Sequence, residues 1–112
     1  MHNLSSKKCV PCEGGIPSLG PLEIKKYLSQ ISGWEVDSAK KEIQKNFEFN
    51  DFKSAMKFVR RVADIVESEG HHPDIFIHDW NEVRLTLSTH AIAGLSENDF
   101  IVAAKINKIS VV

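Results

Sequence analysis

The feature that constrains the fold most is a long amphipathic stretch between Asn50 and Gly70. Its apolar side chains recur every three or four residues, a spacing that places them on one face of an α-helix. Asn50 is suited to cap the start of this helix and Gly70 to end it, so we predict a helix over residues 51–69. A helix with one apolar face must bury that face against a second layer. The apolar residues are Phe52, Ala55, Met56, Val59, Val62, Ala63 and Val66.

Two pairs of strand-like segments, one on each side of this helix, can supply that layer. Apolar and polar residues alternate along them, which is typical of half-buried strands. In the second segment, Lys45 is the one polar residue on an otherwise apolar face. In the fourth, Thr86 and Ser88 lie on a polar face that a ligand or a partner subunit could use. The segments are WEVD and EIQKNFEF before the helix, and DIFIHDW and VRLTLSTH after it, with Asn81-Glu82 as the second connection.

Two shorter helices complete the pattern. Pro21 is suited to the first turn of one helix, which Gly33 ends, and Ser96 with Asp99 forms the S-x-x-D capping signature of the other. The order of elements is therefore α-β-β-α-β-β-α. This order predicts a single α+β domain over residues 21–112, a four-stranded antiparallel sheet with its helices packed on one face.

The overall charge argues against two classes of partner. The formal net charge is -1 at pH 7, and the basic residues occur as short doublets among acids, so we predict no surface for nucleic acid or anionic membranes. No stretch approaches the roughly 20 apolar residues of a membrane span, and the N-terminus lacks the apolar region of a signal peptide. We therefore expect no nucleic-acid or membrane partner and a cytoplasmic location.

The first 20 residues contain both cysteines of the chain, in the sequence Cys9-Val10-Pro11-Cys12. A CxxC motif indicates a zinc half-site or a redox pair when a second CxxC or a βαβ unit accompanies it, and this sequence has neither. His2 and the later histidines lack the paired spacing of a closed zinc site. We therefore predict that residues 1–20, rich in Gly and Pro, form a flexible, reduced tail without an assigned role.

Three histidines are the best candidates for chemistry. His71 and His72 follow the main helix, whose C-terminal dipole favours the imidazolium form, and His90 ends the last strand beside a Gly-containing loop. Their spacing disfavours a metal site, because helical metal pairs use i and i+4 and strand pairs use i and i+2. Acid/base chemistry needs several proton donors and acceptors around one substrate, so the group favours a metal-free acid/base site.

Several residues near the histidines leave alternatives open. Glu67 either pairs with His71 at i+4 or is a solvated acid. Asp99 either only caps the last helix or also faces a pocket. Trp80 either packs in the core or stacks on a flat ligand. His78 has no companion that suggests chemistry.

Taken together, these residues resemble the signature of the pterin-4a-carbinolamine dehydratase family. The pattern in this sequence is Glu67-x3-His71-His72-Pro73-x6-Trp80-x9-His90-x8-Asp99, with LTLSTHAIAGLSENDF around the last histidine. The resemblance is close over residues 67–99. The predicted order of elements also agrees with that family's fold over roughly residues 20–110.

The resemblance implies a lyase that dehydrates 4a-hydroxytetrahydropterin to quinonoid dihydropterin. This step recycles the pterin of an aromatic amino acid hydroxylase, such as a phenylalanine hydroxylase. The resemblance further implies a homodimer or homotetramer, no metal, no cofactor, and catalytic roles for His71, His72 and His90. The substrate-binding positions that it implies are Glu67, Pro73, Trp80, Thr89, Ala91 and Asp99.

Two other classes of function stay open on the sequence alone. A non-catalytic pterin-binding or protein-interaction module, comparable to relatives that act as dimerisation cofactors, would keep the fold without a need for all three histidines. A metal-dependent lyase or hydrolase would bind metal stoichiometrically and lose activity with a chelator. Intact His71, His72 and His90 favour the dehydratase over the interaction module.

Overall fold

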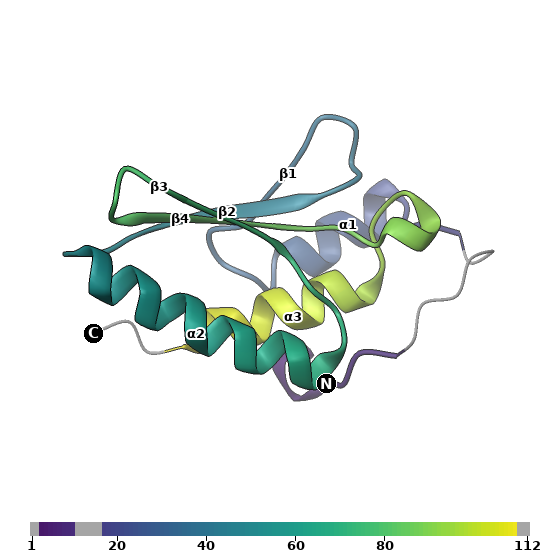
Figure 1. Cartoon of the computed structure of the whole chain (residues 1–112). Coiled ribbons are helices and arrows are strands. Elements are labelled where there is room, and N and C mark those ends of the chain that lie inside the picture. The colour runs from purple at the N-terminus through teal and green to yellow at the C-terminus, as the bar shows by residue number, and fades with distance from the viewer. Residues whose placement is uncertain (1–2, 11–16, 110–112) are drawn as a thin grey trace.

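The computed structural model describes residues 3–10 and 17–109 of the chain (Figure 1). The order of its helices and strands is the predicted α-β-β-α-β-β-α, with two additional short 3₁₀ helices, η1 and η2. The elements are η1 (Leu4–Ser6), α1 (Pro21–Leu28), β1 (Glu35–Val36), β2 (Ile43–Glu48), α2 (Phe52–Glu69), β3 (Asp74–His78), β4 (Glu82–Leu87), η2 (His90–Ile92) and α3 (Glu97–Asn107).

The four strands form one antiparallel sheet in the order β1-β2-β4-β3. β2 and β4 come from different predicted hairpins and pair in the centre of the sheet, with Ile43 opposite Leu87. Figure 1 shows α2 and α3 against one face of the sheet, and these two helices contact each other. The predicted α+β class, with a four-stranded antiparallel sheet, is therefore confirmed.

The sheet face toward the helices carries the predicted apolar residues and one lysine. Lys45 lies on this face of β2, where burial lowers the pKa of its ammonium group. Its Nζ reaches the edge of the core and donates to the backbone oxygen of Ser32 at 3.1 Å and to Asn107 Oδ1 at 2.9 Å. These two hydrogen bonds compensate for the burial of Lys45, the one polar residue on this face of β2. The fully buried residues of β4 are Val83, Leu85 and Leu87.

α2 confirms the predicted main helix but not its predicted cap. Asp51, and not Asn50, caps the helix, because Asp51 directly precedes the first turn and its carboxylate accepts from the Ser54 N–H at 2.7 Å. Gly70 ends the helix as predicted, with a left-handed φ of 69°. Within residues 3–10 and 17–109, neither α2 nor any other helix is long and apolar enough to cross a membrane.

Two predicted boundaries are wrong. α1 ends at Leu28, and Gly33 instead serves the later turn into β1 with a φ of 84°. The connection between β3 and β4 consists of Asp79, Trp80 and Asn81, so it contains the predicted Asn81, whereas Glu82 already belongs to β4. Asp79 and Trp80 both have positive φ, and His78 pairs with Glu82 across this three-residue loop.

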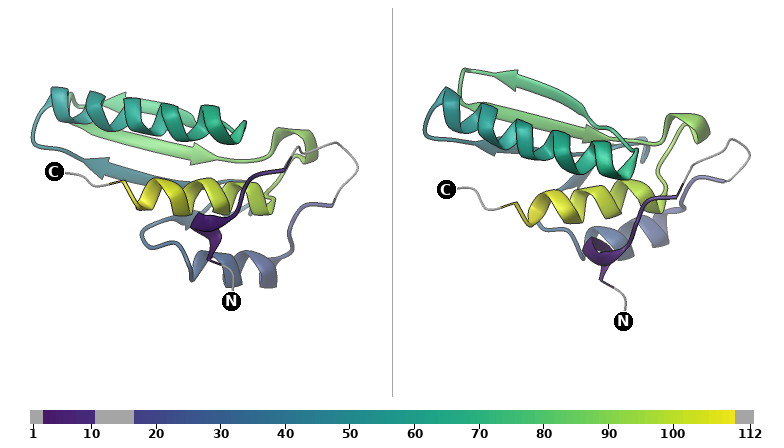
Figure 2. Two further views of the ribbon diagram at one scale, coloured as in Figure 1. Left: turned by 90° about the horizontal axis from the view of Figure 1, so that it is seen from below. Right: turned by 60° about the horizontal axis from the view of Figure 1, so that its bottom comes forward.

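Residues 3–10 of the predicted tail pack against the domain. Leu4 is buried and η1 contacts α3, while Lys7 Nζ donates to Glu97 Oε2 at 2.7 Å. Figure 2 shows this segment in purple beside α3, on the side away from the sheet. The prediction of a flexible tail therefore does not hold for residues 3–10, because one apolar side chain and several hydrogen bonds fix them. Cys12, the second cysteine of the CxxC motif, lies outside the described residues.

The packing of α2 on β2 yields a test of the core. Phe58 is 3% exposed and lies 4.6 Å from Phe47 and 5.0 Å from Phe49, measured between ring centroids. We expect Phe58→Ala to lower the free energy of unfolding by about 3–5 kcal/mol, because it removes these contacts and leaves a cavity.

Phe52→Ala is the matched control for this change. Phe52 lies on the same helix but is 51% exposed, so we expect a loss below about 1 kcal/mol. Urea denaturation measures both values. Equal losses in the two variants would contradict the packing described here.

Candidate active site

A cavity of about 410 Å³ lies where the end of α2, the end of β4 and the start of α3 meet. Its volume falls in the range of small-molecule sites. All three predicted catalytic histidines line it, although they come from two separate parts of the chain. The lining residues are Cys9, Val10, Glu69, Gly70, His71, His72, Ser88, Thr89, His90, Ala91 and Asn98.

His71 is held by a buried carboxylate. Its Nε2 lies 2.6 Å from Oδ1 of Asp99, which is fully buried. An ionised carboxylate only accepts hydrogen bonds, so Nε2 must carry the proton in this contact. In the neutral ring, Nδ1 is then the basic nitrogen, and it has no partner among residues 3–10 and 17–109. The pair therefore fixes both the orientation and the tautomer of His71.

The second oxygen of Asp99 caps α3. Asp99 Oδ2 accepts from the Ser96 N–H at 3.0 Å and from the Thr89 hydroxyl at 2.8 Å, as expected for a capping box extended by one side chain. The Ser96 hydroxyl lies 2.7 Å from that of Thr89 and donates to it, since the Thr89 proton is already used. Of the two roles that the sequence left open for Asp99, the structure shows the cap; Asp99 does not line the cavity itself and adjoins it only through His71 and Thr89.

His72 and His90 are less constrained than His71. His72 Nε2 lies 3.3 Å from Glu67 Oε1, and both side chains are exposed. Of the two alternatives left open for Glu67, the pair with His71 does not form, and Glu67 is an exposed acid. The reason is that Gly70 ends α2, so the helical i, i+4 geometry does not continue to residue 71. His90 is exposed and begins η2 directly after Thr89.

The remaining predicted site residues are divided by the geometry. Ala91 and Thr89 line the cavity, whereas Glu67, Pro73, Trp80 and the fully buried Asp99 do not. Trp80 is exposed in the turn between β3 and β4. β3 leads away from the histidines, and a strand of its five residues spans about 17 Å, so its far end cannot reach this cavity in the same subunit.

Six lining residues were not among the predicted site residues: Cys9, Val10, Glu69, Gly70, Ser88 and Asn98. Two of them belong to the segment that was predicted to be a flexible tail. The buried Asn98 is bonded to Val10 in both directions, and Glu69 accepts from the backbone N–H of Cys9 at 2.8 Å. A polar Asn98 in the apolar helix α3 was the one signal in the sequence for such a contact.

Cys9 is not a reactive thiol in this position. Burial, followed by the nearby carboxylate of Glu69, raises the pKa of its thiol to about 12. The thiolate is the nucleophilic and metal-binding form of cysteine. Cys9 is therefore protonated at neutral pH.

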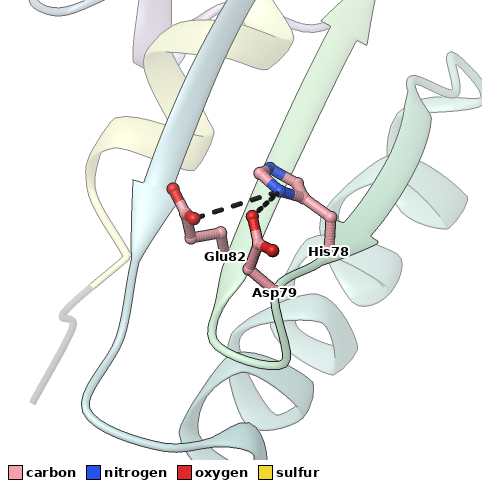
Figure 3. Close-up of side chains that lie close together, drawn as sticks. All are labelled: His78, Asp79 and Glu82. Carbon is pink, nitrogen blue, oxygen red and sulfur yellow. Dashed lines mark hydrogen bonds and ion pairs between the residues drawn. The ribbon is translucent and has the colours of Figure 1, made fainter.

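A second cluster of polar side chains, which contains the single histidine His78, lies on the other side of the sheet in the β3–β4 hairpin (Figure 3). His78 Nδ1 is 2.9 Å from Asp79 Oδ2 and 3.9 Å from Glu82 Oε2, and its Nε2 is 3.1 Å from Asn46 Oδ1. The sequence showed no companion of His78 that suggests chemistry; in the structure Asp79 and Glu82 lie beside it, and β2 brings Asn46 to it across β4. The cluster shares no residue with the cavity.

Comparisons with known proteins assign the chain to a family. The family profile described as pterin 4 alpha carbinolamine dehydratase matches residues 17–109. A relative from Methylococcus capsulatus, provisionally named as such a dehydratase, is 44% identical over 108 residues, 96% of this chain and 94% of that one. Pterin-4-alpha-carbinolamine dehydratase 2, mitochondrial, of Arabidopsis thaliana is 42% identical and covers 99% of this chain, which spans 61% of that protein. The chain belongs to the pterin-4α-carbinolamine dehydratase family, a family of lyases.

Solved structures agree with this assignment. A transcriptional coactivator/pterin dehydratase from Brucella melitensis is 33% identical, with a TM-score of 0.75 over 80% of this chain and 95% of that chain. A pterin dehydratase-like protein identified as a RuBisCO assembly factor in the alpha-carboxysome is 22% identical, with a TM-score of 0.57 over 67% of this chain and 86% of that chain. The second likeness shows the fold alone.

Two carboxylates hold the N-terminal segment beside the cavity. The hydrogen bond from Lys7 is the main cause that lowers the pKa of Glu97 below its ordinary 4.5. Burial raises the pKa of Glu69, but hydrogen bonds from Lys105 and from the Cys9 N–H outweigh burial and lower it below 4.5. Both groups are therefore ionised at neutral pH.

These lowered pKa values predict acid sensitivity. A carboxyl group whose pKa is lower in the folded protein stabilises the fold above its ordinary pKa, and this contribution is lost as the pH falls through the folded-state pKa. We expect the melting temperature to fall below about pH 4.5, and to fall less in Glu69→Gln, whose amide does not titrate. Calorimetry across this range is the measurement, and identical pH profiles for the two proteins would refute the assignment.

Proposed function

We propose that this protein dehydrates 4a-hydroxytetrahydropterin to quinonoid dihydropterin and water by histidine acid/base catalysis. The observation that carries the proposal is the meeting of His71, His72 and His90 around one cavity, in a chain of the dehydratase family. The orientation of His71 by the buried Asp99 supports it, since a ring held in one orientation can position a substrate group for proton transfer by the other two histidines.

The chemistry needs two proton transfers. The 4a-hydroxyl must be protonated as it leaves as water, and the adjacent ring nitrogen must lose its proton, so that the C–O bond breaks as a C=N bond forms. We assign these transfers to His72 and His90, which line the cavity and are free to approach a substrate. His71 orients the departing hydroxyl through the ring nitrogen that Asp99 leaves free.

The other residues would hold the pterin. Thr89 and Ala91 line the cavity and Pro73 follows His72, so we place these three beside the bound ring. Glu67 acts through His72 in this scheme, by its contact at 3.3 Å. In the proposed physiological role, the product returns to an aromatic amino acid hydroxylase such as phenylalanine hydroxylase. The homodimer or homotetramer, the cytoplasmic location and a substrate contact of Trp80 stay predictions.

A second candidate is a pterin-binding or protein-interaction module without activity. The name of the Brucella melitensis structure, which joins transcriptional coactivator and pterin dehydratase, favours keeping this alternative. The arrangement of His71 weighs against it. A surface used only for interaction has no need for a buried carboxylate that fixes one imidazole tautomer.

The decisive experiment follows the decay of enzymatically generated 4a-hydroxytetrahydropterin by ultraviolet absorbance. We expect the wild-type protein to accelerate this decay, and a chelator to leave the rate unchanged. His72→Ala and His90→Ala should each reduce kcat by about 10²-fold or more, since that is the usual scale of acid/base catalysis by one group.

His78→Ala is the matched control for these variants. His78 lies in the hairpin cluster outside the cavity, so its loss should leave kcat unchanged. No acceleration by the folded wild-type protein would rule out the dehydratase and leave the binding module. Inhibition by a chelator would instead favour a metal-dependent enzyme.

A further inference from the structure

The segment Lys7–Val10, which we call the strap, forms a wall of the cavity that holds the histidines. Cys9 and Val10 line this cavity together with His71, His72 and His90, although they lie about 60 or more residues away in sequence. We propose that the strap is a part of the pterin site and that the Val10 side chain is a specificity-determining contact for the pterin ring. This inference rests on the proposed dehydratase function.

Buried polar groups hold the strap in register. The amide of the buried Asn98 accepts from the Val10 N–H at 3.1 Å and donates to the Val10 oxygen at 2.7 Å, so it pairs with the backbone as a neighbouring strand would. Glu69 accepts from the Cys9 N–H at 2.8 Å and is itself neutralised by Lys105 at 2.8 Å. An amide whose two ends bind one residue fixes the position of that residue along the chain.

The groups that hold the strap are neighbours of the groups that hold His71. Glu69 is the last residue of α2, just before Gly70 and His71, and Asn98 directly precedes Asp99 in α3. The strap therefore spans the same two helix ends that the His71–Asp99 contact joins. Through these two helix ends, a displacement of the strap is transmitted to His71 and Asp99. Asn98 therefore acts as a positioning residue.

Val10 is suited to contact a flat heteroaromatic ring. It is 67% exposed, and it is the only branched aliphatic side chain among the described residues that line the cavity. The other lining groups are mostly histidines and small or polar residues, which supply proton transfer and hydrogen bonds. A pterin ring has two apolar faces as well as polar edges, so a bound ring that covers Val10 would remove apolar surface from water.

Val10→Ser is the first test, because an exposed side chain can be changed without loss of the fold. We expect KM for 4a-hydroxytetrahydropterin to rise about three- to tenfold, the scale of one or two lost apolar groups, with kcat nearly unchanged because the histidines are intact. Leu22→Ser is the matched control. Leu22 is 84% exposed on α1 and does not line the cavity, so its KM should equal that of the wild type.

Asn98→Ala tests the positioning role. We expect the same direction of change in KM and, in addition, faster hydrogen exchange of the Val10 amide, because its acceptor is lost. Val10→Ser should keep this amide protected. Thermal unfolding shows whether each variant is folded. If Asn98→Ala does not fold, the KM of Val10→Ser alone decides the proposal.

The outcomes separate this proposal from the proposed function. Catalysis by the wild type with unchanged KM in Val10→Ser would overturn the role of the strap and leave the dehydratase intact. No catalysis by the wild type would overturn the dehydratase. In that case, binding of 7,8-dihydropterin by calorimetry decides the strap: weaker binding by Val10→Ser than by wild type and Leu22→Ser supports it, and equal or absent binding refutes it.

Discussion

The carboxylate of Asp99 is the group on which the rest of the site depends. A buried charge is costly unless hydrogen bonds compensate it, and here the compensation comes from the start of α3, from Thr89 and from His71. The same group therefore begins a central helix and orients a histidine. Because the capping of α3 stabilises the fold, Asp99 is in place once the domain has folded. Its contact then fixes the position of His71 without a separate loop.

Gly70 decides how the two adjacent histidines separate. Its left-handed conformation ends α2, so His71 and His72 leave the helix in an extended path that Pro73 favours, and neighbouring side chains then point apart. His71 turns toward the buried carboxylate, while His72 stays in contact with solvent and Glu67. One pair of identical residues thus gives one ring held by a buried carboxylate and one exposed ring, the combination that the proposed dehydration uses.

Local patterns predicted the elements well, because helical and strand periodicity, the Ser96–Asp99 box and Gly70 act within a few residues. The three cavity histidines were also found from the sequence. What the sequence did not predict depends on contacts between distant residues: Asn98 with Val10, and Asn46 with His78 across strand β4. The cap of α2 was misplaced by one residue for a different reason, since Asn50 and Asp51 are both good capping residues and only the local backbone decides between them.

The fold by itself does not decide between an enzyme and a binding module. A protein with this fold and 22% identity is named as a RuBisCO assembly factor, so activity must be argued from side chains. The Asp99–His71 contact is tied to helix capping, and its loss would cost stability as well as activity. His72, His90 and Val10 are exposed, and substitutions there leave the core unchanged. A chain of this family can therefore lose or redirect its chemistry most easily at the exposed rim of the cavity, and the rim is where an enzyme and a binding module with the same fold should differ.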